Sequence, residues 1–219
     1  MSYILNIETA TKNCSISLAK NGETLICKEI SEQGYSHAEK LHVFIDEILK
    51  ESAIAMSDLK AIAVSQGPGS YTGLRIGVSS AKGLCYGLQI PLIAIDTLST
   101  LAIQVQNEDG LIVPMIDARR MEVYSAIFNS KKEMIREVQA EILTEESFIN
   151  ETEKIYFIGD SNEKAKSVLN KSNFIFLDNI IYPSANEMGA ISHTKFLKDD
   201  FVDVAYFEPY YLKDFMFAK

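Results

Sequence analysis

Short apolar runs alternate with amphipathic stretches along the first half of the chain. Runs of this kind are typical of buried strands, and they occupy residues 3–9, 59–66 and 91–96. Two alternating segments, 13–20 and 23–30, flank Asn21-Gly22, a dipeptide that favours a two-residue hairpin because both residues tolerate positive φ. Apolar positions at helical spacing then predict two helices. The first carries Leu41, Phe44, Ile45, Ile48 and Leu49 on one side, and the second has about eighteen residues and begins near residue 71. The first half therefore predicts the order β-β-β-α-β-α-β.

The second half repeats this order of elements about 100 residues later. A strand over 111–119 continues as a hairpin with a turn at 129–132, and a short helix is expected at 145–150. Strand, turn and helix follow at 154–165. Two such units predict a two-lobed α/β protein built from duplicated ribonuclease H-like β-β-β-α-β-α units with mixed sheets. That is the layout of the actin, hexokinase and Hsp70 nucleotide-binding folds.

The polar stretch 104–110 is where we expect the boundary between the lobes. The prediction is an N-terminal lobe over residues 1–106 and a C-terminal lobe over residues 107–219. The chain ends in the aromatic segment FEPYYLKDFMF. Two interpretations of this tail stay open. It packs back on the protein itself, on the first lobe, or it docks on a partner.

Composition narrows the functional class. The chain is 47% hydrophobic and 23% charged, as soluble globular proteins are, and its net charge of −9 argues against a grip on nucleic acid by this chain alone. Three cysteines without a CxxC spacing argue against a disulfide framework or a zinc site and fit a reducing cytosol. Because the N-terminus resembles a strand and no apolar run is long enough to cross a bilayer, we expect a cytoplasmic protein without a membrane partner.

The densest cluster of glycines follows the strand at 59–66. Its residues are Gly67, Pro68, Gly69, Ser70, Thr72 and Gly73. Ser70 or Thr72 can cap the following helix, and the free amides of a helix start attract anions. The spacing GxGxxxG nevertheless fits neither common phosphate motif, and no GK[ST] follows. It favours a tight turn over a phosphate loop.

The helix after this loop carries three stripes on a helical wheel. A core stripe contains Leu74, Gly77, Val78, Ala81, Leu84, Cys85 and Leu88, and a polar stripe includes Arg75. The third stripe is rich in small residues and lies nearly opposite the core. We expect either a partner subunit or the second lobe to cover it, and the residues assigned to a partner interface are Arg75, Ile76, Ser80, Gly83 and Gly87.

Few residues suggest chemistry. Glu8 and Asp117 end the first strand of each half, where acids of nucleotide-binding folds can hold Mg²⁺; with Thr9 they mark a vestigial nucleotide cleft. The alternative is that the two acids simply end strands.

No metal site is expected from the histidines. His37 and His42 are five residues apart, so on a helix their side chains point in different directions and cannot bind one metal from the same face. The remaining nucleophiles by type are Ser65, Ser70 and Cys85, and none has a histidine base nearby in sequence.

Four segments together resemble a known family. They are GPGSYTGLRIG at 67–77, ILNIETAT at 4–11, IDARRMEVY at 116–124 and PYYLK at 209–213. On these residues the chain is similar to the TsaB (YeaZ) family, which takes part in making N6-threonylcarbamoyladenosine in tRNA. The resemblance covers nearly the whole chain. Lys213 stands where that family usually has arginine, which keeps the charge and loses the planar fork.

The resemblance implies a non-catalytic subunit. The catalytic paralogue, TsaD, carries an HxxxH metal motif and binds ATP, whereas HAEKLH in this chain has the wrong spacing. This chain is then expected to bind no cofactor alone and to pair with TsaD through helices of its N-terminal lobe. With the ATPase TsaE, the pair would transfer threonylcarbamoyl from its adenylate to the adenosine next to the anticodon. The tRNA would be held by the complex, and without a partner the same surface could form a homodimer.

Two other functions stay open at this stage. One is an ATP-dependent small-molecule kinase of the same fold, which would require nucleotide affinity and acids around a cleft. The other is a peptidase acting on its paralogue, which would require a nucleophile beside a base.

Overall fold

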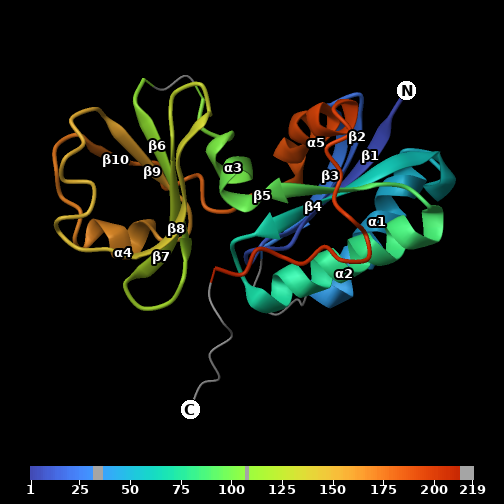
Figure 1. Cartoon of the computed structure of the whole chain (residues 1–219), viewed down its shortest axis with the longest axis horizontal. Helices are drawn as coiled ribbons and strands as arrows, with labels where there is room; N and C mark the ends of the chain where they lie inside the picture. Colours follow the sequence, from blue (N-terminus) through green and yellow to red (C-terminus); the bar gives the residue numbers. More distant parts are fainter. Residues whose placement is uncertain (32–36, 107–108, 213–219) are drawn as a thin grey trace, which may run out of the picture. The chain divides into compact units, whose positions relative to one another are not determined.

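The chain forms two compact units. The structure is a computed structural model that describes residues 1–31, 37–106 and 109–212 (Figure 1). One unit contains Met1–Thr97 and the described part of Pro183–Lys219, and the other is Leu98–Tyr182. This division differs from the predicted lobes 1–106 and 107–219, because the second unit begins earlier and the chain returns to the first unit at Pro183. Residue 107, at the predicted boundary, lies outside the described residues.

The first unit is built on a mixed sheet of order β3-β2-β1-β4-β5. Its strands are β1 (Tyr3–Glu8), β2 (Cys14–Lys20), β3 (Glu23–Ile30), β4 (Leu59–Gly67) and β5 (Leu92–Asp96). β1, β2 and β3 are antiparallel neighbours, and β4 and β5 run parallel to β1. Lys20 pairs with Glu23 around Asn21 and Gly22, both at positive φ, so the predicted two-residue hairpin is confirmed.

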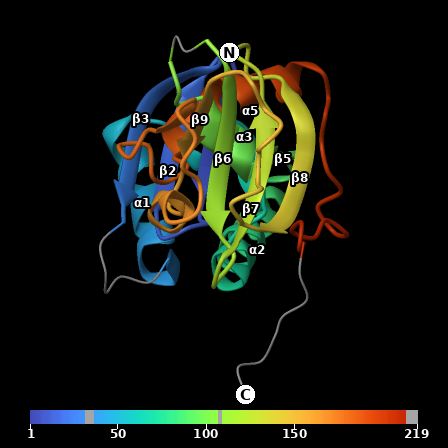
Figure 2. The same ribbon diagram turned by 90° about the vertical axis from the view of Figure 1, so that its left-hand side faces the viewer.

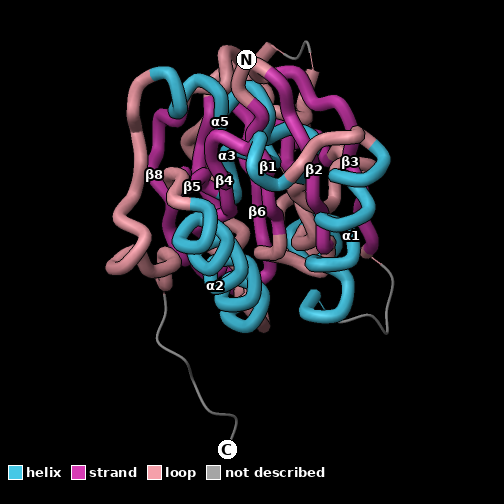
Figure 3. The backbone as a smooth tube through the Cα atoms, turned by 90° about the vertical axis from the view of Figure 1, so that its right-hand side faces the viewer, coloured by secondary structure: helices cyan, strands magenta, loops and turns pink. Residues whose placement is uncertain are grey.

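Helices cover both faces of this first sheet. Its helices are α1 (His37–Glu51), η1 (Met56–Asp58), α2 (Tyr71–Leu88), η2 (Ala185–Glu187) and α5 (Met188–Leu197). α1 and α2 bury one face, in a core that includes Leu5, Ile62 and Val78. Figure 3 shows these two helices on the same side of the strands, and Figure 1 shows α5 on the other side.

The return of the chain at Pro183 has a physical reason. Ile4 and Ile93 point to the face opposite α1 and α2, and they are buried there with Ala185 and Met188. Strands that are apolar on both faces need a cover on each. The helix that supplies the second cover, α5, comes from the end of the chain rather than from the first half.

The second unit repeats the sheet topology, in the order β10-β9-β6-β7-β8. Its strands are β6 (Leu111–Asp117), β7 (Glu122–Phe128), β8 (Met134–Ile142), β9 (Ile155–Ile158) and β10 (Phe174–Phe176), and its helices are α3 (Thr97–Ala102), which starts at the unit boundary, and α4 (Asn162–Lys166). β6 is antiparallel to β7 and parallel to β9, as β1 is to β2 and β4. Figure 2 shows β6, β7 and β8. The predicted duplication is therefore confirmed.

One predicted element of the second unit is wrong. Residues 145–150 form turns instead of a helix. Phe148 has a φ of 58°, which no right-handed helix contains, and the Ser147 hydroxyl accepts a hydrogen bond from the amide of Thr144 at 3.0 Å. Among the described residues, no helix is long and apolar enough to cross a membrane.

Candidate functional site: the glycine loop and helix α2

The glycine loop joins the end of β4 to the start of α2. The Ser70 hydroxyl accepts a hydrogen bond from the Gly73 amide at 3.3 Å and caps α2. Ser70 is one of the two residues that were predicted to cap this helix. Thr72, the alternative cap, is an exposed residue of the first turn. The Ser70 amide donates to the carbonyl oxygen of Ala10 at 2.7 Å. The amides of Ser70 and Gly73 are therefore both used inside the chain.

The glycines let α2 approach the turn after β1 very closely. A Cβ atom at Gly69 would overlap Ala10, and one at Gly73 would overlap the carbonyl oxygen of Thr9. One turn later, a Cβ at Gly77 would overlap the Thr9 hydroxyl. That hydroxyl donates to the carbonyl oxygen of Gly73 at 2.8 Å. Backbone packing thus accounts for this glycine spacing without a ligand.

The outer side of α2 has a different character. The buried residues of this helix include Leu74, Val78, Ala81 and Cys85, which confirms the core stripe. Apart from the adjacent residues and the backbone of α2 itself, no described atom lies within 4 Å of a Cβ built at Gly83 or Gly87. These two glycines therefore leave open space above the helix.

A shallow hollow of about 370 Å³ continues this outer side toward α1. It is lined by Ala38 and His42 of α1 and by Arg75, Ile76, Ser79 and Ser80 of α2. The Ser80 hydroxyl and the His42 ring lie 3.3 Å apart and tie the two helices together. Three residues assigned to the partner interface thus line one hollow, and the other two are the exposed glycines.

Glu8 lies sealed inside the first unit. Its side chain is fully buried at the end of β1, where it accepts hydrogen bonds from the Ala10 amide at 2.6 Å and from the Ser65 hydroxyl. Burial raises the pKa of Glu8 to about 7, the two hydrogen bonds oppose that rise, and the carboxylate of Asp96 adds to it. Thr9 is also buried. Neither residue offers a surface to a nucleotide in this structure.

Asp117 belongs to the second unit and has a partner there. Its exposed carboxylate forms an ion pair with Lys164 of α4 and accepts a hydrogen bond from the Arg119 amide at 3.2 Å. Sequence reasoning missed Lys164, although its place in the helix after β9 gave a weak signal. Among the described residues, no three side chains of His, Cys, Asp or Glu gather in a way that could hold a metal ion.

The described part of the tail packs on the first unit. Lys82 of α2 donates to the carbonyl oxygens of Ala205 and Phe207, each at 3.0 Å. The Tyr210 amide donates to the carbonyl oxygen of Gln66 at 2.7 Å, next to the glycine loop. The first of the two interpretations thus describes the tail as far as residue 212. Lys213 lies outside the described residues.

The nucleophiles considered by type are buried or already hydrogen-bonded in the described part of the chain. Ser65 is fully buried and bonded to Glu8, and Ser70 is committed to the helix cap. Burial raises the pKa of Cys85 to about 12. Burial, the helix cap and a raised pKa thus account for these three side chains without a catalytic role.

A family model and curated proteins match the sequence of this chain. The family model described as TsaD, tRNA N6-adenosine threonylcarbamoyltransferase, matches residues 28–206. The chain is similar to the tRNA threonylcarbamoyladenosine biosynthesis protein TsaB of Bacillus subtilis, with 38% identity over 135 residues, which are 62% of this chain and 58% of that protein. It is 29% identical to TsaB of Escherichia coli over 220 residues, which cover 96% of this chain and 94% of that protein.

A solved structure shows the same fold. YeaZ from Pseudomonas aeruginosa superposes with a TM-score of 0.84 at 24% identity, over 97% of this chain and 100% of that one. The chain therefore belongs to the family that the TsaD model describes and, within it, to the TsaB (YeaZ) proteins, on the two-lobed α/β fold of actin, hexokinase and Hsp70.

Proposed function

We propose that this chain is a non-catalytic subunit in the formation of N6-threonylcarbamoyladenosine in tRNA. It pairs with a catalytic TsaD paralogue and acts with the ATPase TsaE. The complex transfers threonylcarbamoyl from threonylcarbamoyl-AMP to the adenosine next to the anticodon. ATP and metal are bound by the partner proteins, and the tRNA is bound by the complex rather than by this acidic chain alone. The names of the similar TsaB proteins support this role.

The outer side of α2 is the observation that carries the proposal. Gly83 and Gly87 leave room for a second helix to approach the α2 backbone, and Tyr86 beside them is 76% exposed. Small residues permit close helix packing, and exposed aromatic residues are frequent at protein interfaces. The hollow between α1 and the first turns of α2 adds a second feature of the same helix that another protein could fill. The outer side of α2 also accommodates a second copy of this chain when no paralogue is present.

The glycine loop and Glu8 support the non-catalytic part of the proposal. Thr9 and Ala10 fill the space in front of the loop that a nucleotide phosphate would need. Glu8 faces Ser65 instead of solvent. A kinase or peptidase that used Glu8 or Ser65 would need that side chain to be reachable, and both are fully buried.

Reconstitution tests the role directly. The purified chain is mixed with its own TsaD and TsaE homologues, unmodified tRNA and threonylcarbamoyl-adenylate, and modified adenosine is measured. We expect turnover that requires this chain and none from this chain alone. Equal turnover in its absence would contradict the proposal.

Substitutions on α2 test the surface. Gly83→Leu or Gly87→Leu should weaken binding of the TsaD homologue, because each places a large side chain in the open space. The matched control is Ala190→Leu, at an exposed position of α5 on the other face of the same sheet. If the glycine variants bind the homologue as tightly as the control does, the surface is assigned wrongly.

A further inference from the structure

The turn between β6 and β7 presents two arginines in an unusual backbone conformation. Arg119 and Arg120 are both exposed, with φ angles of 73° and 50°. Left-handed backbone costs residues with a Cβ about 1–2 kcal/mol each, and glycine or asparagine would fit better. Strained positions that keep a long charged side chain point to a function of that side chain.

Side chains of Lys164 and Asp160 brace this turn through hydrogen bonds. The Lys164 ammonium, whose side chain is only 18% exposed, donates to the carbonyl oxygen of Arg120 at 3.0 Å, to that of Glu122, and to the Asp117 carboxylate. The Asp160 carboxylate accepts from the Asp117 amide at 2.8 Å. Both acids are therefore engaged in building the turn. The brace holds the turn in one shape, which lowers the entropic cost of binding a ligand there.

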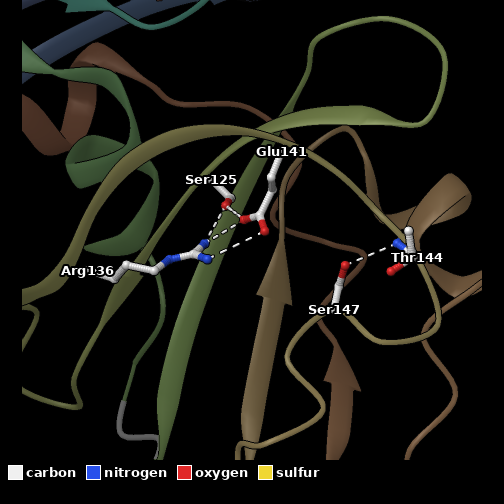
Figure 4. Close-up of polar contacts among 5 residues, drawn as sticks. All are labelled: Ser125, Arg136, Glu141, Thr144 and Ser147. Atoms are coloured by element: carbon white, nitrogen blue, oxygen red, sulfur yellow. Dashed lines mark hydrogen bonds and ion pairs between the residues drawn. The ribbon is translucent and has the colours of Figure 1, made fainter.

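The two guanidinium groups have no partner in the part of the chain that the structure describes. The sequence holds four arginines. The Arg136 guanidinium donates hydrogen bonds to the Glu141 carboxylate and to the Ser125 hydroxyl, each at 2.6 Å (Figure 4). Arg75 donates to the Tyr211 hydroxyl at 3.3 Å. For Arg119 and Arg120, no side-chain hydrogen bond or ion pair occurs within the described residues.

We propose that Arg119 and Arg120 bind phosphate groups of the tRNA backbone in the assembled complex. This inference rests on the proposed function and adds a contact made by this chain itself. Arginine presents a planar fork of donors that matches phosphate oxygens bidentately, and it is weakly hydrated. Because the chain carries a net charge of −9, attraction to RNA has to be local, and a braced pair of free guanidinium groups provides it.

The salt dependence of tRNA binding tests this proposal. The complex of this chain with its TsaD and TsaE homologues is titrated with an unmodified tRNA transcript at several salt concentrations. Arg119→Asn with Arg120→Asn removes both charges and places a residue that tolerates left-handed backbone at each position. Each lost phosphate contact lowers the slope of log K against log salt by about 1. The affinity advantage of the wild type should thus shrink about tenfold between 50 and 200 mM salt.

A matched control separates contact from overall charge. Lys131→Ala with Lys154→Ala removes two positive charges from exposed positions at the opposite end of the same sheet, one in the turn between β7 and β8 and one directly before β9. We expect this variant to keep the wild-type slope. Equal slopes for the wild type and the asparagine variant would overturn the proposal, and so would an equal loss in the lysine variant. The melting temperature of the asparagine variant should stay at or above that of the wild type, so a lower affinity cannot come from unfolding.

Two further results would be informative. If the asparagine variant assembles poorly with the partner proteins while assembled complexes bind tRNA normally, the arginines contact a protein and the proposal is wrong. The proposed function is measured separately, by chain-dependent modification with the wild type. Failure of that reaction refutes the function, whereas the phosphate contact is decided by the tRNA affinities alone.

Discussion

Glu8 is expected to make the stability of the first unit depend on pH. Its carboxyl group is fully buried and receives hydrogen bonds from the Ala10 amide and the Ser65 hydroxyl. The acidic groups that face it are Asp96, whose charge raises its pKa, and Cys14, whose own pKa is raised to about 11 mainly by burial. We predict that Glu8→Gln removes the part of the pH dependence between pH 5 and 8 that Glu8 contributes. The amide can accept from Ala10 and donate to Ser65, so it replaces the protonated acid.

The size of the effect follows from the pKa. In the folded protein the pKa of Glu8 is raised from 4.5 to about 7. A raised pKa means that the folded state holds its proton more tightly than the unfolded state does. The resulting stabilisation is complete below pH 4.5 and is lost as the pH rises through 7. The full shift corresponds to about 3 kcal/mol, of which about 2–3 kcal/mol falls between pH 5 and 8.

Urea unfolding followed by circular dichroism measures this difference. The free energy of unfolding of the wild type and of Glu8→Gln is determined at several pH values from 5 to 8. All other titrating groups are common to both proteins, so the difference between the two curves isolates Glu8. We expect the variant to gain about 2–3 kcal/mol over the wild type across this range. Glu137→Gln, at an exposed position of β8, is the control for losing one negative charge.

A difference between wild type and Glu8→Gln that stays constant from pH 5 to 8 would refute the reasoning. Glu8 would then be ionised throughout the range, and its hydrogen bonds would outweigh the cost of burial.

Other predictions concern packing and reactivity. Gly73→Ala should destabilise the protein by about 1–3 kcal/mol in urea unfolding, because the added Cβ would overlap the Thr9 backbone. Gly83→Ala should stabilise it by about 0.5–1 kcal/mol, because the space around Gly83 is open and alanine favours a helix more than glycine does. Equal effects of the two would contradict the packing described here. Ser70→Ala should cost about 1 kcal/mol through loss of the helix cap, and an unchanged unfolding midpoint would contradict that role. Cys85 should react with iodoacetamide at pH 7.5 far more slowly in the folded protein than in urea, since burial raises its pKa to about 12; comparable rates would show the thiol to be exposed.

Local sequence patterns predicted most of the secondary structure, because they act over short distances. Alternation and turn chemistry located the hairpin at Asn21-Gly22, and helical periodicity located α2 and its core stripe. The family resemblance also rested on local motifs. The predicted helix at 145–150 failed because Phe148 takes a left-handed backbone in a series of turns, which its apolar pattern does not reveal.

The sequence alone determined the order of the elements from β1 to β5, the repeat of the strands β6 to β9, and the side of α2 that faces the core. Only the tertiary structure decided why the glycines are where they are, since Gly73 meets Thr9, which lies far from it in the chain. It also decided that Glu8 is sealed against Ser65 and that the chain returns after Pro183 to cover the first sheet. The physical reason is the same in each case. Burial and close approach depend on segments distant in sequence, and periodicity reports only which face of an element is apolar, not what covers it.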